Sequence, residues 1–416
     1  MKARFKIFNL TVPDVPVENT ELDIDFREYQ PFGSDNLFIS HLASINRKAP
    51  VHAGILKYKV IYILGKKLEL SHEELIRSVN SKGESLYTVL ERIIYDYEGL
   101  GNAYLEVITD KKGSFFFIDH IDATKVRVTQ DGLGVLLHPK WSEIGSSKDS
   151  LKLIPLWPEF DHRRDYEGKE EDKYLRSVFH FKAYEPEFEY YGLPNWLGGL
   201  DAAGIAYKTN KWNISRLDNS FKTSGILLVD GDMDEDEAED FMDGVKNELT
   251  GEGNTGKLMV VIKQFGGDDK HKFIPIEKEV EGDWIKLHQQ SESDLIISHQ
   301  WYRSLAGIAD NTGFDTKRIL NEYEVALNTI ISKEQSFILE PIKKIYARFG
   351  KDISDMEFVN KPPISIFGLL DPNLFVKIHE GRAMAGLDPE EEKEEHQQFI
   401  KNGTNNSIRS QNDSDQ

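Results

Sequence analysis

The stretch from Tyr190 to Gly225 reads YYGLPNWLGGLDAAGIAYKTNKWNISRLDNSFKTSG and decides how the rest of the chain is organised. Tyr191-Gly192-Leu193-Pro194 predicts a turn, and proline suits the first position of a helix because its missing N–H would have no partner there. No further proline occurs before Phe221. The stretch therefore predicts one long amphipathic helix of about 28 residues, or about 42 Å at 1.5 Å per residue.

The predicted helix carries apolar residues at alternating three- and four-residue steps. They are Leu200, Ala203, Tyr207, Ile214, Leu217 and Phe221, with Asn210 as a polar break. Small residues near the start would let a neighbouring helix approach closely: Gly198, Gly199, Ala202, Ala203 and Gly204. A helix so rich in glycine at one end is weak alone, so we expect it to pack against other helices. A core helix of an ordinary globular protein would show the same pattern.

The composition of the 416-residue chain excludes several kinds of site. It has no cysteine, which excludes disulfides, thiolate metal sites and cysteine catalysis. The first residues lack the apolar core of a signal peptide, and no apolar run approaches the roughly 20 residues of a membrane span. The net charge is −20, from 51 basic and 71 acidic residues. That balance argues against a protein that binds nucleic acid over a broad basic surface. It is compatible with a protein that lies near DNA without binding it tightly.

Apolar patterns and turn residues predict mixed helices and strands before the long helix. Strands are expected within 54–70, as a hairpin at 103–109 and 114–118, and at 126–128, 134–137 and 177–184. Helices are expected from a capping box at 71–74 to Val79, and from Ser85 to a stop at 99–102. Residues 143–172 are polar and predict a loop.

The chain after the long helix repeats this mixture, so the sequence predicts an α+β fold. Strands are expected at 225–229, 257–262 and 271–276, with an acidic helix over 231–249. A second long helix is predicted over 284–305, interrupted near 291–294, followed by a loop over 306–316. A third runs from Lys317 to about Leu339, is kinked or restarted at Pro341 and is closed by Gly350. A last helix, capped by Asp371-Pro372, ends near Gly386.

Gly251 to Lys257 places its glycines and lysine as a phosphate-binding P-loop does. The motif needs Ser or Thr next, to bind magnesium, and Leu258 stands there instead. It also needs a strand before and a helix after, so that backbone N–H groups face the phosphates. The predicted elements have the opposite order, which argues against nucleotide binding.

Other chemical motifs fail in similar ways. Residues 230–234 resemble the start of a calcium loop, but Glu235 replaces the turn glycine and Phe241 replaces the bidentate glutamate. The twelve histidines include no pair at metal-ligand spacing on one helix. His299 is interpreted as a packed structural residue. The sequence thus predicts no metal site, no cofactor and no catalytic residue.

Four segments, in this order, resemble the portal protein of tailed double-stranded DNA bacteriophages. The first is Tyr97 to Glu106, with its Gly-Asn-Ala-Tyr core, and the second is Tyr191 to Pro194 with the helix that follows. The third is the strand pair at 225–227 and 256–262, and the fourth is 294–299 leading to 305–308. The chain departs from the family at 301–303, where Trp-Tyr-Arg replaces the usual Val-Pro-Pro, and at 222–225, where Lys-Thr-Ser-Gly replaces an Asn-Gly turn.

The resemblance implies a phage-portal-like subunit with a wing, a long-helix stem, a small α/β clip and a helical C-terminal crown or tail. The wing would be residues 1–190, joined by a long wing helix at 317–350. The stem would be 191–221 and 284–305, and the clip 222–283. The tunnel loop would be 306–316, the crown-like segment 351–388 and a disordered tail 389–416.

The resemblance also implies a structural role without catalysis or cofactor. Such a protein forms a homododecameric ring at one vertex of the virion capsid, assembled in the host cytoplasm, through which double-stranded DNA is packaged and ejected. Implied partners are further copies of the chain, the terminase large subunit, head–tail connector or adaptor proteins, and the major capsid and scaffolding proteins, with no membrane. The DNA would pass without sequence specificity.

The same mapping assigns candidate DNA-facing residues. They are Asn311, Thr312, Lys317 and Arg318 near the tunnel loop, and Lys208, Lys211 and Arg216 on the stem. Ordinary solvated charge on a helix surface is the alternative interpretation of each.

Two other functions stay open. A P-loop-type packaging ATPase would depend on Gly251 to Lys257. Another ring-forming connector or tail protein of the virion would share the long helices. ATP hydrolysis would favour the first, and a location along the tail would favour the second.

Overall fold

The computed structural model describes residues 16, 18, 29–110, 116–143, 151–160, 174–218, 225–229, 258–262, 271–275, 281–308, 315–364, 377–384 and 388. The chain divides into two compact units. The first comprises residues 1–60 and 74–301, and the second comprises residues 61–73 and 302–416. Helices and strands occur in both units, which confirms the predicted α+β class.

The first unit is built on two antiparallel sheets. In one, β2 (Asn102–Asp110) lies between β3 (Phe116–Ile121) and β7 (Tyr174–Lys182). In the other, β5 (Gly134–Leu137) lies between β4 (Val126–Val128) and β6 (Lys152–Pro155). The strands predicted at 103–109, 126–128, 134–137 and 177–184 are confirmed.

Strand β6 corrects the loop predicted over 143–172. It pairs with β5 along its whole length, from Lys152 opposite Leu137 to Pro155 opposite Gly134. Ile154 is its single buried residue, so the strand carries too little alternation to be recognised from the sequence.

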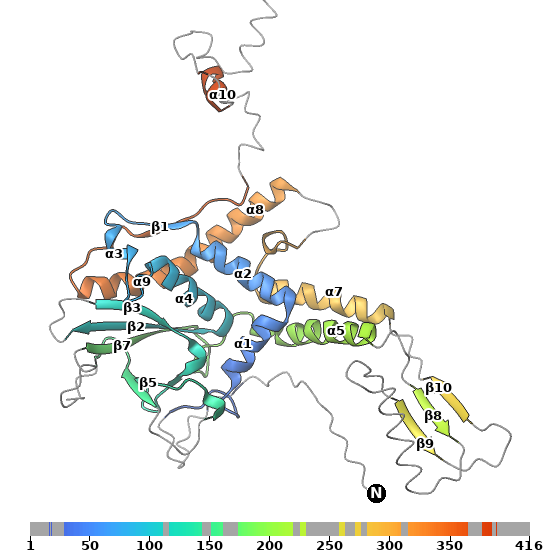
Figure 1. Ribbon diagram of the computed structural model, residues 1–416. Helices are drawn as coiled ribbons and strands as arrows, with labels where there is room; N and C mark the ends of the chain where they lie inside the picture. The colour runs from blue at the N-terminus through green and yellow to red at the C-terminus, as the bar shows by residue number, and fades with distance from the viewer. Residues whose placement is uncertain are drawn as a thin grey trace, which may run out of the picture. The chain divides into compact units, whose positions relative to one another are not determined.

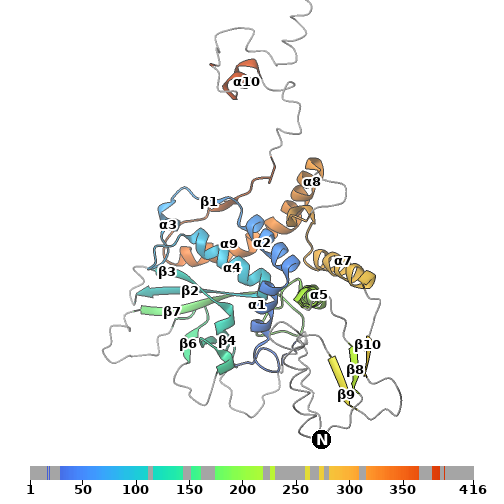
Figure 2. The same ribbon diagram turned by 45° about the vertical axis from the view of Figure 1, so that its right-hand side comes forward.

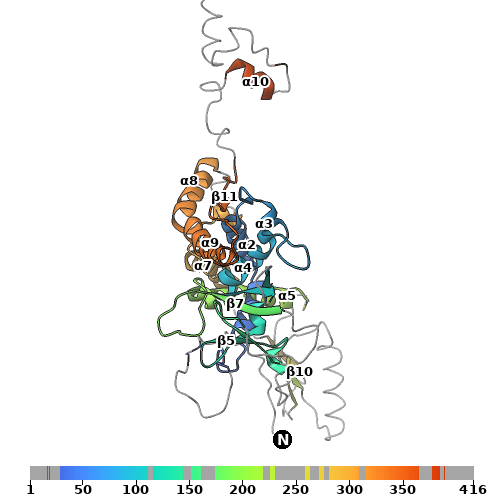
Figure 3. The ribbon, with the colours of Figure 1, turned by 90° about the vertical axis from the view of Figure 1, so that its left-hand side faces the viewer.

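Helix α4 (Leu86–Leu100) packs on the β3-β2-β7 sheet (Figures 1 and 3). It begins after Ser85, whose hydroxyl accepts a hydrogen bond from the Thr88 N–H at 3.3 Å. It ends at Gly101, which adopts a left-handed conformation with φ of 71°. Both ends and the buried face are as predicted.

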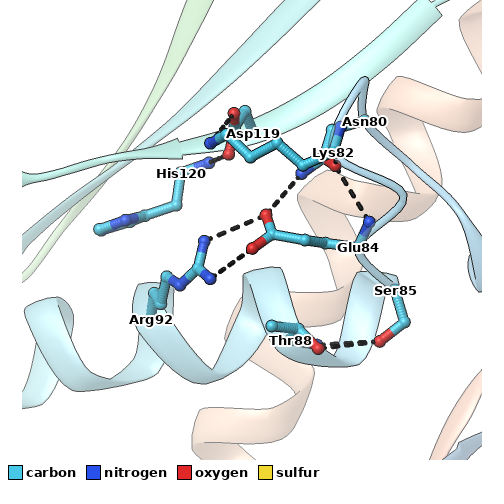
Figure 4. Close-up of polar contacts among 8 residues, drawn as sticks. All are labelled: Asn80, Lys82, Glu84, Ser85, Thr88, Arg92, Asp119 and His120. Carbon is cyan, nitrogen blue, oxygen red and sulfur yellow. Dashed lines mark hydrogen bonds and ion pairs between the residues drawn. The ribbon is translucent and has the colours of Figure 1, made fainter.

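Ion pairs fasten the turn before α4 to that helix and to strand β3 (Figure 4). Lys82 Nζ lies 2.8 Å from Asp119 Oδ2, and Arg92 Nη2 lies 2.6 Å from Glu84 Oε1. Hydrogen bonds from Arg92 and then Asn80 lower the pKa of Glu84 to about 2. The turn is therefore bound to strand β3 through Lys82 and to helix α4 through Glu84.

The helix predicted to run from 71–74 to Val79 is shorter than predicted. Helix α3 is a single turn, Glu74–Arg77, and does not reach Val79. The Ser71 N–H and hydroxyl both donate to the Asp355 carboxylate within the second unit.

Helix α2 (Pro50–Leu64) replaces the strands predicted within 54–70, where the one strand of the structure is β1 (Lys67–Glu69). The buried side chains of α2 recur at helical spacing: His52, Ile55, Leu56, Lys59, Val60, Ile63 and Leu64. Two of these positions are polar, so apolar residues alone hide the helical period. Pro50 at the first helical position favours the helix further.

Two motifs far apart in the sequence meet where β2 begins. A Cβ atom on Gly192 would lie 2.4 Å from the Gly101 carbonyl oxygen, and one on Gly101 would lie 2.4 Å from the Leu193 carbonyl carbon. The two backbones can approach this closely because both positions lack a side chain. These glycines belong to the first two segments that carry the family resemblance.

Asn102 joins the two backbones with its side-chain amide. Its Nδ2 donates to the carbonyl oxygens of Leu100 at 3.0 Å and Gly192 at 2.7 Å. Its Oδ1 accepts from the Gly192 N–H at 2.8 Å and from His180 Nε2 at 3.0 Å. Every hydrogen-bonding position of this fully buried amide is therefore used.

The residues that lead toward the first long helix are anchored on both sides. The Tyr191 ring stacks on Phe32 with centroids 4.2 Å apart. Its hydroxyl donates to the Gln30 carbonyl at 2.6 Å and accepts from the Val128 N–H at 3.1 Å. Trp196 Nε1 donates to the Gly99 carbonyl at 3.2 Å. The turn is thus part of the core rather than a surface loop.

A small three-stranded sheet forms from strands predicted in the middle of the chain. Strand β8 (Gly225–Val229) pairs parallel with β9 (Leu258–Ile262) and antiparallel with β10 (His271–Pro275). This confirms the strands predicted at 225–229, 257–262 and 271–276. The predicted acidic helix at 231–249 lies outside the described residues.

The second unit is mainly helical. Strand β1 pairs with β11 (Glu357–Val359), and α8 (Thr316–Ala326) continues through a π-helical segment, Leu327–Ile331, into α9 (Ser332–Arg348). Helix α9 runs through Pro341, so the predicted restart there is wrong, and the interruption of α-helical geometry lies earlier, at the π segment. Gly350, with φ of 68°, lies just past the end of α9 as predicted.

The last described helix is α10 (Ile378–Met384). It lies within the helix predicted to follow Asp371-Pro372, and both of those residues lie outside the described residues. The predicted disordered tail at 389–416 also lies outside them.

Replacing Asn102 with alanine should destabilise the protein by about 2–4 kcal/mol, because four buried groups lose their partner together. Chemical denaturation of the variant checks this. Asn195→Ala, at an exposed position of the same turn region, should change stability by less than about 0.5 kcal/mol. Equal stability of the two variants would contradict the central role of the Asn102 amide.

Candidate functional site

The two long helices of the first unit, α5 (Leu200–Asp218) and α7 (Glu281–Ser298), lie side by side (Figures 1 and 2). The start of α5 meets the end of α7, so the pair is antiparallel. A Cβ atom on Gly199 would lie 2.2 Å from Ser298 Oγ and 3.4 Å from Leu295 Cδ2. This confirms, at Gly199, the close helix approach predicted from the cluster of small residues.

Helix α5 starts later than predicted. Pro194 belongs to the anchored turn, a 3-10 turn follows at Leu197–Gly199, and the α-helix begins at Leu200. Leu200 and Ala203, which begin the predicted stripe, are buried, together with the small residues Ala202, Ala206 and Thr209. Further along the helix, Ile214 of the predicted stripe is 57% exposed. Small side chains at the buried positions allow close packing on α7. The helix end predicted at Phe221 lies outside the described residues.

Helix α7 runs without interruption through 291–294, against the prediction. Ser291 Oγ donates to the His288 carbonyl at 2.8 Å, and Ser293 Oγ donates to the Gln289 carbonyl at 3.1 Å. Serines that bond back to the preceding turn are accommodated within a helix. The helix ends at Ser298, short of the predicted residue 305, and Gln300 has a positive φ of 51°.

A buried polar cluster lies where α7 ends. His52 Nδ1 lies 2.9 Å from His299 Nε2, and His52 Nε2 lies 2.8 Å from Asn46 Oδ1. Asn46 Nδ2 donates to the Gly99 carbonyl at 3.0 Å. The His52 ring also lies 4.1 Å, centroid to centroid, from that of Trp196. We call Asn46, His52, Trp196 and His299 the helix-root cluster.

The hydrogen bonds set the tautomers of the neutral histidines. Asn46 Oδ1 can only accept, so His52 donates from Nε2, and a neutral His52 then accepts at Nδ1. His299 must then donate from Nε2, which leaves its Nδ1 as an acceptor. Among the described residues, this buried Nδ1 has no hydrogen-bond partner.

Burial accounts for the neutral state. It lowers the pKa of His52 from 6.5 to about 3. It also lowers the pKa of His299 well below its usual value, with smaller contributions from His52 and Lys59. The interpretation of His299 as a packed structural residue is confirmed, since its side chain is 1% exposed.

A buried ion pair lies close along the same helices. Lys59 Nζ of α2 lies 2.7 Å from Glu98 Oε2 of α4, and the two side chains are 3% and 2% exposed. Removing one partner of such a pair leaves an uncompensated buried charge. Lys59 and Glu98 thus tie α2 to α4 beside the helix-root cluster.

The candidate cations of α5 lie on its exposed surface where the structure describes them. Lys208 and Lys211 are exposed, and Lys211 Nζ lies 5.8 Å from the centroid of the Tyr207 ring. Lys48 Nζ lies 5.9 Å from the same ring. Arg216 belongs to α5, but its side chain lies outside the described residues. Tyr207 thus brings two lysines together on this surface.

The remaining candidates belong to the second unit. Asp315 caps α8 by accepting from the N–H groups of Lys317 and Arg318. Arg318 Nε donates to Glu322 Oε1 at 2.8 Å, so this guanidinium already has a carboxylate partner. Glu322 also accepts a hydrogen bond from Ser304. Asn311 and Thr312 lie outside the described residues.

Sequence reasoning missed the partners of His299. Lys59 lies in the stretch for which strands are predicted, and His52 lies just before it. Asn46 carries no motif, and Glu98 lies in the resemblance segment Tyr97 to Glu106 without being singled out there. The detectable signal is the helical spacing of 52, 55, 56, 59, 60 and 63, which appears once polar residues are allowed into the stripe. Within the described ranges, no three metal-ligating side chains come together. No described helix is both long and apolar enough to span a membrane.

Residues 65–269 match the family model described as phage portal protein. Over that range the match confirms the resemblance to portal proteins that the sequence indicates. No curated protein matches the chain.

Several solved structures resemble this chain over most of its length. One is from the neck of an empty GTA particle, with 14% identity, a TM-score of 0.47 and coverage of 84% of this chain and 94% of that one. Another is from the virion of a native gene transfer agent particle, with 16% identity, a TM-score of 0.46 and the same coverage. A third is an HK97 family phage portal protein from Corynebacterium diphtheriae, with 9% identity, a TM-score of 0.41 and coverage of 72% and 90%. Sequence identity to these structures is low, and the resemblance to portal proteins depends on the family match over residues 65–269.

Gly199→Ala should destabilise the protein by about 1–3 kcal/mol, because the added methyl group overlaps Ser298. Gly198→Ala is the matched control, since a Cβ atom there would meet nothing within 4 Å. Adding Ser298→Gly to Gly199→Ala should recover part of the loss, as a double-mutant cycle in denaturant would measure. If both alanine variants behaved alike, close packing at Gly199 would be refuted.

Stability should fall as the pH drops from 7.5 to 5, in part because of His52. The folded-state pKa is about 3 against 6.5 in the unfolded chain, so the unfolded state binds more protons in this range. One such histidine contributes a slope approaching about 1.4 kcal/mol per pH unit below pH 6.5. His52→Gln should flatten the measured slope by that amount. An unchanged slope in His52→Gln would contradict the neutral buried imidazole.

Proposed function

We propose that the protein is the subunit of a portal ring that conducts double-stranded DNA into and out of a viral capsid. The family match over residues 65–269 is the observation that carries this proposal. The ring would contain twelve copies of the chain at one capsid vertex of the virion. Its role would be structural, as conduit and docking platform, without catalysis or cofactor.

The arrangement of elements supports the division of labour proposed for the chain. Helices α5 and α7 form an antiparallel pair, and the chain between them contains the small sheet β10-β8-β9. We assign the helix pair to the stem and the inserted sheet to the clip. We assign helix α4 and the β3-β2-β7 sheet on which it packs to the wing. We assign the segment between η6 (Ser304–Ala306) and α8 to the tunnel loop.

Exposed apolar side chains on the helix pair support self-association. Ile214 of α5 is 57% exposed, and Ile297 of α7 is 73% exposed. In a closed ring each subunit presents such surfaces to its neighbours, because the same contact repeats around the axis. We assign these residues to contacts between neighbouring subunits.

The charge of the chain supports a channel that does not hold DNA. A net charge of −20 repels the phosphate backbone and favours sliding over binding. Lys208, Lys211 and Arg216 would then act as isolated contacts on the stem, with Asn311, Thr312, Lys317 and Arg318 near the tunnel loop. Terminase, head–tail connector, scaffolding and major capsid proteins complete the proposed set of partners.

The two alternatives gain no specific support. The glycine-rich segment 251–257 lies outside the described residues, and a strand rather than a helix begins directly after it, at Leu258. A connector or tail ring differs from a portal in its location, so labelling in an assembled particle would separate the two.

Purified protein should form closed rings of about twelve or thirteen subunits with a central channel, visible by negative-stain electron microscopy. Ile297→Glu should reduce the fraction of protein in rings at least about tenfold, because it places a charge in an apolar contact between subunits. Ser293→Glu adds the same charge at an exposed position of the same helix and should leave rings intact. Monomers or dimers of the unmodified chain at every salt and protein concentration would overturn the proposed function.

A further inference from the structure

A cluster of lysines lies where helix α1 (Phe38–Lys48) packs against α5 (Figures 1 and 2). Tyr207 is at its centre, with Lys48 Nζ of α1 5.9 Å and Lys211 Nζ of α5 5.8 Å from the centroid of the ring. Lys208, next to Tyr207 in α5, is exposed. We call Lys48, Tyr207, Lys208 and Lys211 the basic cluster. Because α1 and α5 are far apart in the sequence, no local pattern predicts it.

The positive charge of the basic cluster is not balanced by carboxylates in the part of the chain that the structure describes. Five other lysines there lie 2.7–3.6 Å from a carboxylate oxygen: Lys59, Lys67, Lys82, Lys125 and Lys140. None of the ion pairs between described residues includes Lys48, Lys208 or Lys211. The face of an aromatic ring attracts cations without neutralising their charge. A bound anion would therefore reduce the repulsion among the three ammonium groups.

The chemistry of the basic cluster favours the phosphates of a nucleic acid over a single carboxylate. Three cations exceed the charge that one carboxylate can balance, whereas a DNA duplex carries one negative charge per about 1.7 Å of its axis. An ammonium group is a point charge with rotatable donors, so it can follow a phosphate that changes position. The cluster thus suits a weak contact with a phosphate backbone that moves past it.

We infer that the basic cluster is a phosphate-binding site for the backbone of double-stranded DNA, in which Lys48 and Lys211 contact phosphate and Tyr207 positions them. The inference rests on the proposed function, since that role brings DNA to α5. It adds helix α1, through Lys48, to the elements that contact DNA. Contacts to phosphate carry no sequence information, and they weaken as the salt concentration rises.

Binding of a short fluorescein-labelled DNA duplex to the full-length chain, measured over a range of salt concentrations, tests the site. Lys48→Ala and Lys211→Ala should each weaken binding at least about threefold at low salt, and should reduce the slope of log affinity against log salt by about 1 or more. Lys57→Ala, at an exposed position of α2, removes the same charge and should change neither quantity. Equal effects in all three variants would overturn the inference, as would a lack of binding by the unmodified chain.

Substitution of Tyr207 separates an organised site from a general effect of positive charge. Tyr207→Leu removes the ring face near which both ammonium groups lie, so it should weaken binding of the duplex about as much as the loss of one lysine, although no charge changes. Tyr207→Phe keeps the ring and should bind the duplex as the unmodified chain does. Unchanged binding in Tyr207→Leu would show that the ring does not position the lysines, and would overturn the inference.

Negative-stain electron microscopy of the same variants separates this inference from the proposed function. Lys48→Ala and Lys211→Ala should form rings as the unmodified chain does. Loss of rings with unchanged DNA binding would show that carboxylates of a second copy occupy the basic cluster, and would overturn the inference. Intact rings with unchanged DNA binding would overturn the inference and leave the portal role in place. An unmodified chain that forms no rings, but loses DNA binding in Lys48→Ala, would overturn the portal role and support the phosphate site.

Discussion

The close contact between two glycine-containing backbones is the constraint on which the first unit depends. Gly101 ends α4 and Gly192 opens the turn toward α5, and a side chain on either would collide with main-chain atoms of the other motif. The Asn102 amide then bonds three main-chain groups at this crossing, the Leu100 and Gly192 carbonyls and the Gly192 N–H, and the His180 side chain. The end of one helix and the route to the next are therefore fixed together by backbone geometry, with a single amide as the link.

The helix-root cluster adds a second fixed point, made of polar rather than apolar groups. His52 and His299 remain neutral because burial lowers their pKa, so they form a hydrogen bond without bringing charge into the core. The Lys59–Glu98 pair does carry charge, and each partner compensates the other. Together these groups fix the end of α7 relative to α2, α4 and α1 (Phe38–Lys48), which contains Asn46. Apolar packing alone would specify this arrangement less sharply.

Local signals in the sequence predicted those elements that are governed by local chemistry. Ser85 and Gly101 marked the ends of α4, and alternating residues marked β2, β7 and the small sheet. Helix α2 was not predictable in the same way, because its buried face includes His52 and Lys59, whose partners are distant in the sequence. The start of α5 depends likewise on the contact between Gly192 and Gly101, which no local pattern encodes. His52 and Lys59 were missed for one reason. A polar side chain is expected at the surface, and its burial can be predicted only when the group that bonds to it is known.

The π-helical segment Leu327–Ile331 changes which surfaces of α8 and α9 line up. Val325 and Phe337 lie twelve positions apart and would differ by about 120° around an uninterrupted α-helix, at about 100° per residue. A π-bulge adds one residue to a turn, so the two side chains come to within about 20° of each other. They are 48% and 38% exposed, and so form parts of one continuous outer ridge. The extra residue thus rotates α9 relative to α8, so that Val325 and Phe337 lie on the same side of the two joined helices.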